Sequence, residues 1–132
     1  PLTDKDHLAE RNEDFLAVAP DRIADVCLTS ATTRDAPTPL LQTRSDLCRL
    51  AWNEEAAFDA AGLGPADTLV VLAALDRCFM AGLAYFLGAV RLGARAVRAG
   101  SGSAAHQWRI GVVADHCEGA RPLWRVTPGQ RR

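Results

Sequence analysis

The feature that most constrains the fold is a pair of consecutive apolar segments in the middle of the chain. Residues Thr68 to Leu75 form a continuous run rich in Val and Leu, which is typical of a strand buried on both faces. The next segment, Phe79 to Leu92, carries apolar residues all round a helix, and Gly82 and Gly88 allow another backbone to approach closely. These segments predict an α/β fold in which flanking helices cover a central parallel strand.

The remaining segments predict an alternation of helices and strands. Thr43 can cap a helix whose third residue is Asp46 and which Gly62 stops. A second, more polar strand is predicted at 94–99, then a helix at 104–117 and a third strand at 123–126. This order implies right-handed crossovers and one parallel sheet.

Composition narrows the class of protein. The chain has 132 residues with 48% hydrophobic and 23% charged residues, enough for one domain with a modest core. A net charge of -1 gives no electrostatic case for nucleic acid or an anionic membrane. Four scattered cysteines in apolar segments predict reduced core residues in a cytoplasmic protein, and with three scattered histidines they predict no metal site.

A hydroxyl-rich stretch from Thr29 to Thr38 follows the apolar run 26–28. Backbone N–H groups in a tight loop, joined by Ser and Thr hydroxyls, can surround phosphate oxygens. An anion-binding loop is therefore one interpretation of the stretch. An ordinary solvated turn is the other, because Ser and Thr clusters between periodic segments are usually loops.

An ordered series of short motifs resembles the front part of the phenylacetate-CoA ligase branch of the AMP-forming, adenylate-forming ligases. In that family the loop reads Ser-Ser-Gly-Thr-Thr-Gly and then Lys-Pro-Thr. The residues that match this loop are Ser30, Thr32, Thr33, Pro37 and Thr38. Further matches, in the family's order, are Thr43-Arg44-Ser45-Asp46-Leu47, the run 60–67, Arg91-Leu92-Gly93-Ala94, and Gly100-Ser101-Gly102 with Gln107.

The resemblance implies a site for the β- and γ-phosphates of ATP, formed by Ser30, Ala31, Thr32, Thr33, Arg34 and Thr38. Two of these residues depart from the family, because Ala31 and Arg34 replace glycines. A Cβ at a position that needs φ > 0 or close approach obstructs binding, although the Arg34 guanidinium could instead contribute charge to a phosphate. ATP binding is thus expected to be weak or lost, with Mg²⁺ as a candidate ion.

The chain accordingly divides into an acidic lead-in at 1–25 with a short helix starting near Thr3, a phosphate-loop-like region at 26–42, and helix–strand alternation at 43–132. The family's acyl pocket, its adenine and ribose contacts and its catalytic lysine come later than these motifs. We therefore expect no catalytic residues here and no activity from this chain alone. CoA and a carboxylic acid would bind only in a complete ligase.

Two other functional classes stay open. Gly100-x-Gly102-x-x-Ala105 fits a dinucleotide fingerprint, but the acidic residue expected about 20 positions on is absent, and Arg125 could serve only an NADP phosphate. Alternatively, the chain is a stand-alone binding or interaction module. An apolar helix and short strands with open edges predict a homo-oligomer or a partner chain, through a sheet edge or the face that carries Trp52.

Overall fold

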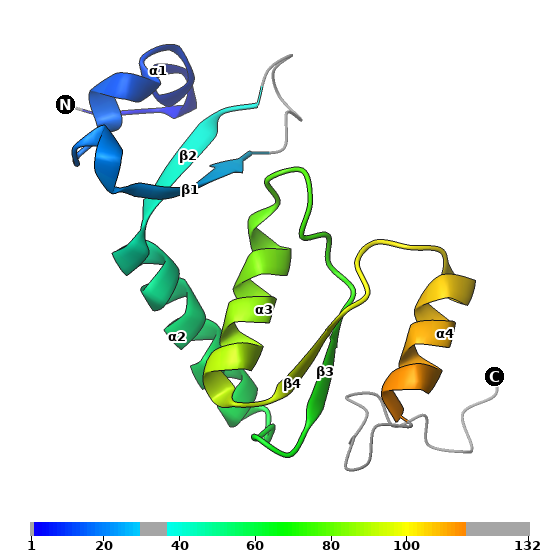
Figure 1. The fold of residues 1–132 in the computed structure, drawn as a ribbon. Helices are drawn as coiled ribbons and strands as arrows, with labels where there is room; N and C mark the ends of the chain where they lie inside the picture. The colour runs from blue at the N-terminus through cyan, green and yellow to red at the C-terminus, as the bar shows by residue number, and fades with distance from the viewer. Residues whose placement is uncertain (1, 30–36, 116–132) are drawn as a thin grey trace.

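The computed structural model describes residues 2–29 and 37–115, and the elements within these ranges alternate between helices and strands. In chain order they are α1 (Lys5–Glu10), two 3-10 turns η1 (Asn12–Phe15) and η2 (Pro20–Arg22), β1 (Ile23–Leu28), β2 (Pro39–Thr43), α2 (Arg44–Ala60), β3 (Thr68–Val71), α3 (Met80–Leu92), β4 (Arg95–Arg98) and α4 (Ala104–Asp115). Figure 1 shows α2 and α3 side by side, with the β1–β2 hairpin and α1 at one end and the β3–β4 pair alongside α3.

The N-terminal segment contains more structure than the short helix and loop that the sequence predicts. Helix α1 begins after Asp4, not Thr3, because Asp4 Oδ1 accepts the N–H groups of Asp6 and His7 at 3.0 and 2.9 Å. The two 3-10 turns follow, and Asn12 Nδ2 donates to the carbonyls of Leu8 and Pro39 at 3.2 and 3.0 Å. The lead-in is therefore attached to β2.

The described strands form two separate two-stranded sheets, which corrects the prediction of one parallel sheet. β1 and β2 pair antiparallel, with Leu28 opposite Pro39 and Cys27 opposite Leu40. β3 and β4 pair parallel, as predicted, with Leu69 opposite Ala96. The strand predicted at 123–126 lies outside the described residues.

Helix α2 begins where the sequence predicts. Thr43 Oγ1 accepts the N–H of Asp46 at 3.3 Å, and the Asp46 carboxylate accepts the N–H and the hydroxyl of Thr43 at 2.9 and 2.8 Å. This reciprocal arrangement is a capping box, which satisfies backbone donors that the first turn leaves free. Gly62 follows the helix with φ 81°, the left-handed conformation that only glycine adopts without strain.

Small residues let α3 pack closely against its neighbours, as the two glycines predict. A Cβ on Gly82 would lie 1.9 Å from the Ala74 carbonyl oxygen, and one on Gly88 would lie 2.3 Å from Glu54 Cβ. Leu69, Ala89 and Ala94 form the centre of the core, with Phe58, Leu63, Leu92 and Ala96 packed around them. The core therefore lies between α2, α3 and the β3–β4 pair.

Three expectations about the apolar segments need correction. β3 ends at Val71 instead of Leu75, and the following segment packs against α3 where Ala74 meets Gly82. α3 is not covered all round, since Tyr85 and Val90 remain 41% and 55% exposed. Cys27 is buried as predicted, whereas Cys48 and Cys78 are exposed, and Cys117 lies outside the described residues.

Candidate phosphate-loop site

The β1–β2 hairpin closes the base of the hydroxyl-rich loop. Beyond the last strand pair, the N–H of Thr29 donates to the Thr38 carbonyl at 3.0 Å. In return, the N–H of Thr38 donates to the Thr29 hydroxyl at 2.9 Å. The eight residues between these two threonines therefore start and end at one point of the hairpin.

Most of the predicted site residues lie outside the described ranges: Ser30, Ala31, Thr32, Thr33 and Arg34. Thr38 is described and is half-buried at the loop base. Its backbone N–H and carbonyl are both bonded to Thr29, which leaves its hydroxyl as the group for a ligand. Thr29 itself was not among the predicted site residues, although its place opposite Thr38 at the edge of the hydroxyl cluster was a visible signal.

A second segment reaches the loop base from the connection between β3 and α3. The N–H of Leu28 donates to the Cys78 carbonyl at 3.1 Å. Arg77 and Cys78 have φ values of 57° and 56°, the left-handed region that costs a residue with a Cβ roughly 1–2 kcal/mol. The guanidinium of Arg77 is largely exposed and lies 3.7 Å from the Asp76 carboxylate. The connection between β3 and α3 thus contacts the hairpin at Leu28, next to the loop base.

The buried thiol of Cys27 in β1 carries no charge near this point. Burial, followed by a 3.2 Å hydrogen bond from Cys27 Sγ to Asp25 Oδ2, raises the pKa of the Cys27 thiol from 9.0 to about 11. Cys27 is therefore protonated near neutral pH, and it contributes no charge to the loop base.

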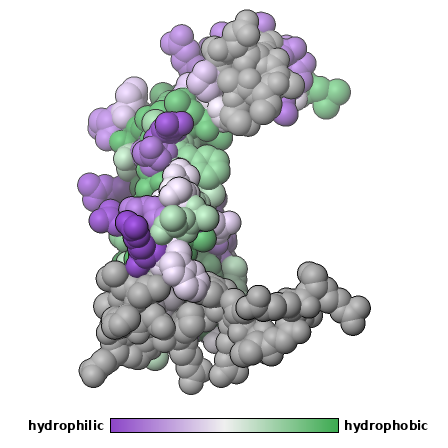
Figure 2. Space-filling view, turned by 90° about the vertical axis from the view of Figure 1, so that its right-hand side faces the viewer, coloured by the Kyte–Doolittle hydropathy of each residue, from purple (hydrophilic) through white to green (hydrophobic). Residues whose placement is uncertain are grey.

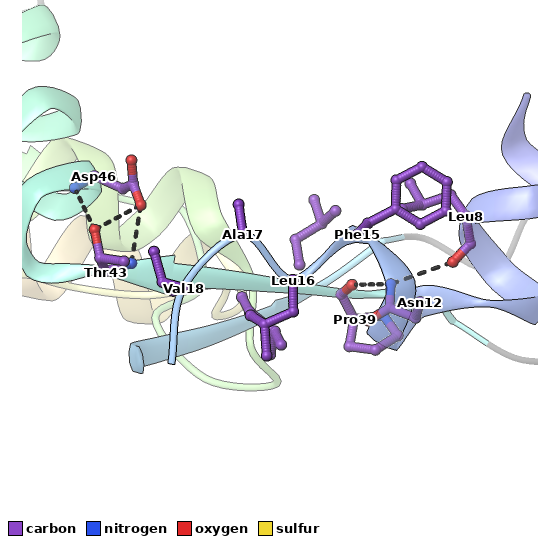
Figure 3. Close-up of a pocket in the computed structure, with 11 residues that line it drawn as sticks. Leu8, Asn12, Phe15, Leu16, Ala17, Val18, Pro39, Thr43 and Asp46 are labelled. Atoms are coloured by element: carbon purple, nitrogen blue, oxygen red, sulfur yellow. Dashed lines mark hydrogen bonds between the residues drawn. The ribbon is translucent and has the colours of Figure 1, made fainter. Parts of the chain in front are cut away.

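A shallow hollow lies on the other face of the hairpin, between the lead-in and β2. Figure 3 shows Leu8, Phe15, Leu16 and Val18 around it, with the Thr43–Asp46 capping box at one end. The backbone N–H of Thr43 holds the pKa of Asp46 below its ordinary value of 3.8, and the Thr43 hydroxyl adds to this effect. The polar groups at that end already bond to each other, so the hollow is mainly a packing feature.

The structure also shows where the dinucleotide fingerprint lies. The fingerprint glycines Gly100 and Gly102 lie between β4 and α4, the strand-to-helix position that a dinucleotide site needs, while Arg125 is outside the described residues. Within 2–29 and 37–115, no three His, Cys, Asp or Glu side chains are grouped so as to hold a metal ion. No helix in these ranges has the length and apolar character needed to cross a membrane.

The fold described above is similar to part of a solved AMP-forming CoA ligase, in agreement with the resemblance in sequence. Its structural matches include 2-hydroxyisobutyryl-CoA ligase in complex with 2-HIB-AMP and CoA in the thioesterification state, at 27% identity and a TM-score of 0.71 over 88% of this chain. The open conformation of that ligase, also with 2-HIB-AMP and CoA, matches at 25% identity and a TM-score of 0.70 over the same share.

The match covers only part of the solved ligases. This chain spans 25% of the ligase in the thioesterification state and 27% of the ligase in the open conformation. No protein-family model matches the sequence, and no curated protein matches it. The similarity therefore rests on the three-dimensional fold together with the ordered motifs.

Proposed function

We propose that this chain is the part of an AMP-forming carboxylic acid–CoA ligase that carries the phosphate loop for ATP. The observation that carries the proposal is the closed loop base, where Thr29 and Thr38 bond reciprocally at 3.0 and 2.9 Å. Successive backbone N–H groups in a tight loop, together with Ser and Thr hydroxyls, can form a concave site for an anion. The fold match to ligase complexes with an acyl-AMP supports the same role.

The proposed ligands follow from the residues at the site. Ser30, Thr32, Thr33 and the Thr38 hydroxyl would contact phosphate oxygens of ATP, with Mg²⁺ as the accompanying ion. Ala31 and Arg34 weaken this contact where a glycine would let the backbone approach closely. A carboxylic acid and CoA would be the other substrates, and their contacts would come from outside this quarter-length segment.

We further propose that this chain alone does not adenylate carboxylic acids. The test is acid-dependent exchange of pyrophosphate into ATP, assayed with a panel of carboxylic acids that includes 2-hydroxy acids. No exchange above background is expected from the purified 132-residue chain. Exchange that depends on an added acid would contradict this.

Phosphate binding is tested separately, by titration with a non-hydrolysable ATP analogue followed through backbone amide signals. The signals of residues 29–38 are expected to shift, and those of α2 to stay in place. Arg34→Gly should tighten binding if its Cβ obstructs the loop, whereas Arg34→Lys should leave binding near the original level. If the loop signals shift neither in the original chain nor in Arg34→Gly, the phosphate site is excluded.

An interaction module is the second candidate function, because apolar side chains remain exposed on the two long helices. Trp52 of α2 is 56% exposed, and the exposed apolar residues of α3 and its N-cap are Phe79, Met80, Tyr85 and Val90. Figure 2 shows hydrophobic surface on the middle part of the molecule. Large apolar patches are uncommon on soluble monomers, so we propose that the chain self-associates or binds a partner through this surface.

Sedimentation over a wide concentration range tests the second candidate. Association that increases with concentration is expected, and Trp52→Glu should weaken it by placing a charge in the contact. Arg49→Glu, also on the exposed surface of α2, is the charged control. A compact monomer at all concentrations that binds no hydrophobic dye would contradict self-association.

A further inference from the structure

Two cysteines far apart in the sequence meet at the base of the phosphate loop. The Leu28 N–H, which directly follows Cys27, donates to the carbonyl of Cys78 at 3.1 Å. This hydrogen bond places the residue next to Cys27 directly beside Cys78, and a disulfide needs the two cysteine Cα atoms within roughly 4.4–6.8 Å of each other. Both thiols are free.

The two thiols differ in their exposure to solvent. Cys78 is exposed on the connection between β3 and α3, so small thiol reagents can reach it. Cys27 is only 2% exposed, and its Sγ donates to Asp25 Oδ2 at 3.2 Å. Cys78 is close enough that its charge contributes to raising the pKa of Cys27, after burial and the Asp25 hydrogen bond. An exposed thiol beside a buried one is the arrangement of an attacking and a resolving cysteine.

We propose that Cys78 and Cys27 form a reversible disulfide when the chain meets a low-molecular-weight disulfide such as oxidised glutathione. The Cys78 thiolate attacks one glutathione sulfur, and the other glutathione leaves as a thiolate. The Cys27 sulfur then attacks Cys78 Sγ, and the second glutathione leaves as a thiolate and takes up the proton that Cys27 loses. Two protein thiols and one glutathione disulfide become one protein disulfide and two glutathione thiols.

The crosslink would act directly on the loop base. Cys27 lies two residues before Thr29, whose hydroxyl accepts the Thr38 N–H. A bond from Cys27 to the β3–α3 connection would hold this end of β1 in place, so the Thr38 amide hydrogen should exchange more slowly in the oxidised protein. This consequence rests on the geometry of the hairpin and does not depend on ATP binding.

The experiment equilibrates the folded 132-residue chain with mixtures of reduced and oxidised glutathione, then blocks free thiols and measures intact mass and non-reduced peptides. In the wild type, a peptide pair should join Cys27 to Cys78, and neither of these two cysteines should retain glutathione. Cys27→Ala should stop with one glutathione on Cys78. Cys48→Ser removes the other exposed cysteine of the described ranges and should still form the crosslink.

The peptide map of the wild type decides the question without any variant, so a misfolded Cys27→Ala protein does not obscure the result. Glutathione that stays on wild-type Cys78 would overturn the proposal, because it would show that Cys27 does not resolve the mixed disulfide. A map in which Cys78 is joined to Cys48 or Cys117 instead would also overturn it.

Discussion

The β1–β2 hairpin and the layer formed by α2, α3, β3 and β4 are stabilised in different ways. In the layer, Leu69 and Ala89 are 2% and 0% exposed, and glycines bring α3 into backbone contact with its neighbours. In the hairpin, Cys27 is the buried residue of β1, while Val26 and Leu28 are 41% and 38% exposed. Figure 1 shows the hairpin at one end of α2 and α3 and the β3–β4 pair alongside α3.

Polar contacts compensate for the small apolar burial of the hairpin. The Thr29–Thr38 pair closes its tip, Asn12 joins it to the lead-in, and the Leu28–Cys78 hydrogen bond joins it to the β3–α3 connection. A typical hydrogen bond contributes about 1 kcal/mol net, so such a region opens more easily than an apolar core. The hairpin that carries the candidate loop should therefore open more easily than the packed layer beneath it.

The largest expected effect is that of a core truncation in the packed layer. Leu69→Ala removes a side chain that is 2% exposed and leaves a cavity, so it should lower the free energy of unfolding by about 3 kcal/mol. Leu41→Ala in β2, where the side chain is 37% exposed, should cost about 1 kcal/mol. Denaturant unfolding measures both. Equal losses would remove the contrast between the two regions.

Close packing of α3 gives the next largest effect. Gly82→Ala places a Cβ against the Ala74 carbonyl oxygen, and the backbone must move to accommodate it. Overpacking should outweigh the better helix propensity of alanine and destabilise the chain by about 2 kcal/mol. Gly64→Ala is the matched control, because nothing lies within 4 Å of the added Cβ. A neutral Gly82→Ala would show that α3 and the preceding loop are loosely packed.

The capping box at Thr43 joins β2 to α2, and substitutions of Thr43 test how much it stabilises this junction. Thr43→Ala removes the hydroxyl that accepts the Asp46 N–H, and loss of such a cap costs about 1 kcal/mol. Thr43→Ser keeps the hydroxyl and should retain most of the stability. The free energy of unfolding at neutral pH separates the two variants. Equal stability of Thr43→Ala and the wild type would show that β2 fixes the start of α2 without the cap.

The same cap should make stability depend on pH. Because the folded state lowers the pKa of Asp46 below 3.8, its contribution is present above that pH and is lost as the pH falls through the folded-state value. The stability difference between wild type and Asp46→Asn should therefore shrink as the pH falls below 3.8. A difference that stays constant over this range would show that the charge of Asp46 is not involved.

Much of the packed layer could be predicted from the sequence because its signals are local. Thr43 with Asp46 marks the start of α2, and the apolar segment from Phe79 to Leu92 indicates α3. The short β1 and β2 were missed because Ile23 to Leu28 lacks a regular alternation of apolar and polar residues, and its apolar Ala24, Val26 and Leu28 face outward.

The candidate site could be predicted only in part. Its hydroxyl cluster is visible in the sequence, but the bond between Thr29 and Thr38 depends on a hairpin that was not predicted. The contact between Leu28 and Cys78 joins residues 50 positions apart, and no local pattern indicates it. Long-range contacts of this kind depend on how α3 is oriented against the rest of the molecule. The sequence predicts that α3 exists, but it does not predict this orientation.

The smallest expected effect concerns the backbone between the two regions. Arg77 takes φ 57°, a left-handed conformation that favours glycine. Arg77→Gly should relieve the left-handed strain, and the greater freedom of glycine in the unfolded chain should offset part of the gain. We expect a net stabilisation of about 0.5 kcal/mol. Arg77→Ala removes the guanidinium but keeps the Cβ, so it should change the free energy of unfolding little. If Arg77→Ala stabilises the chain as much as Arg77→Gly, the charge next to the loop base is responsible, and the backbone between hairpin and layer is not strained.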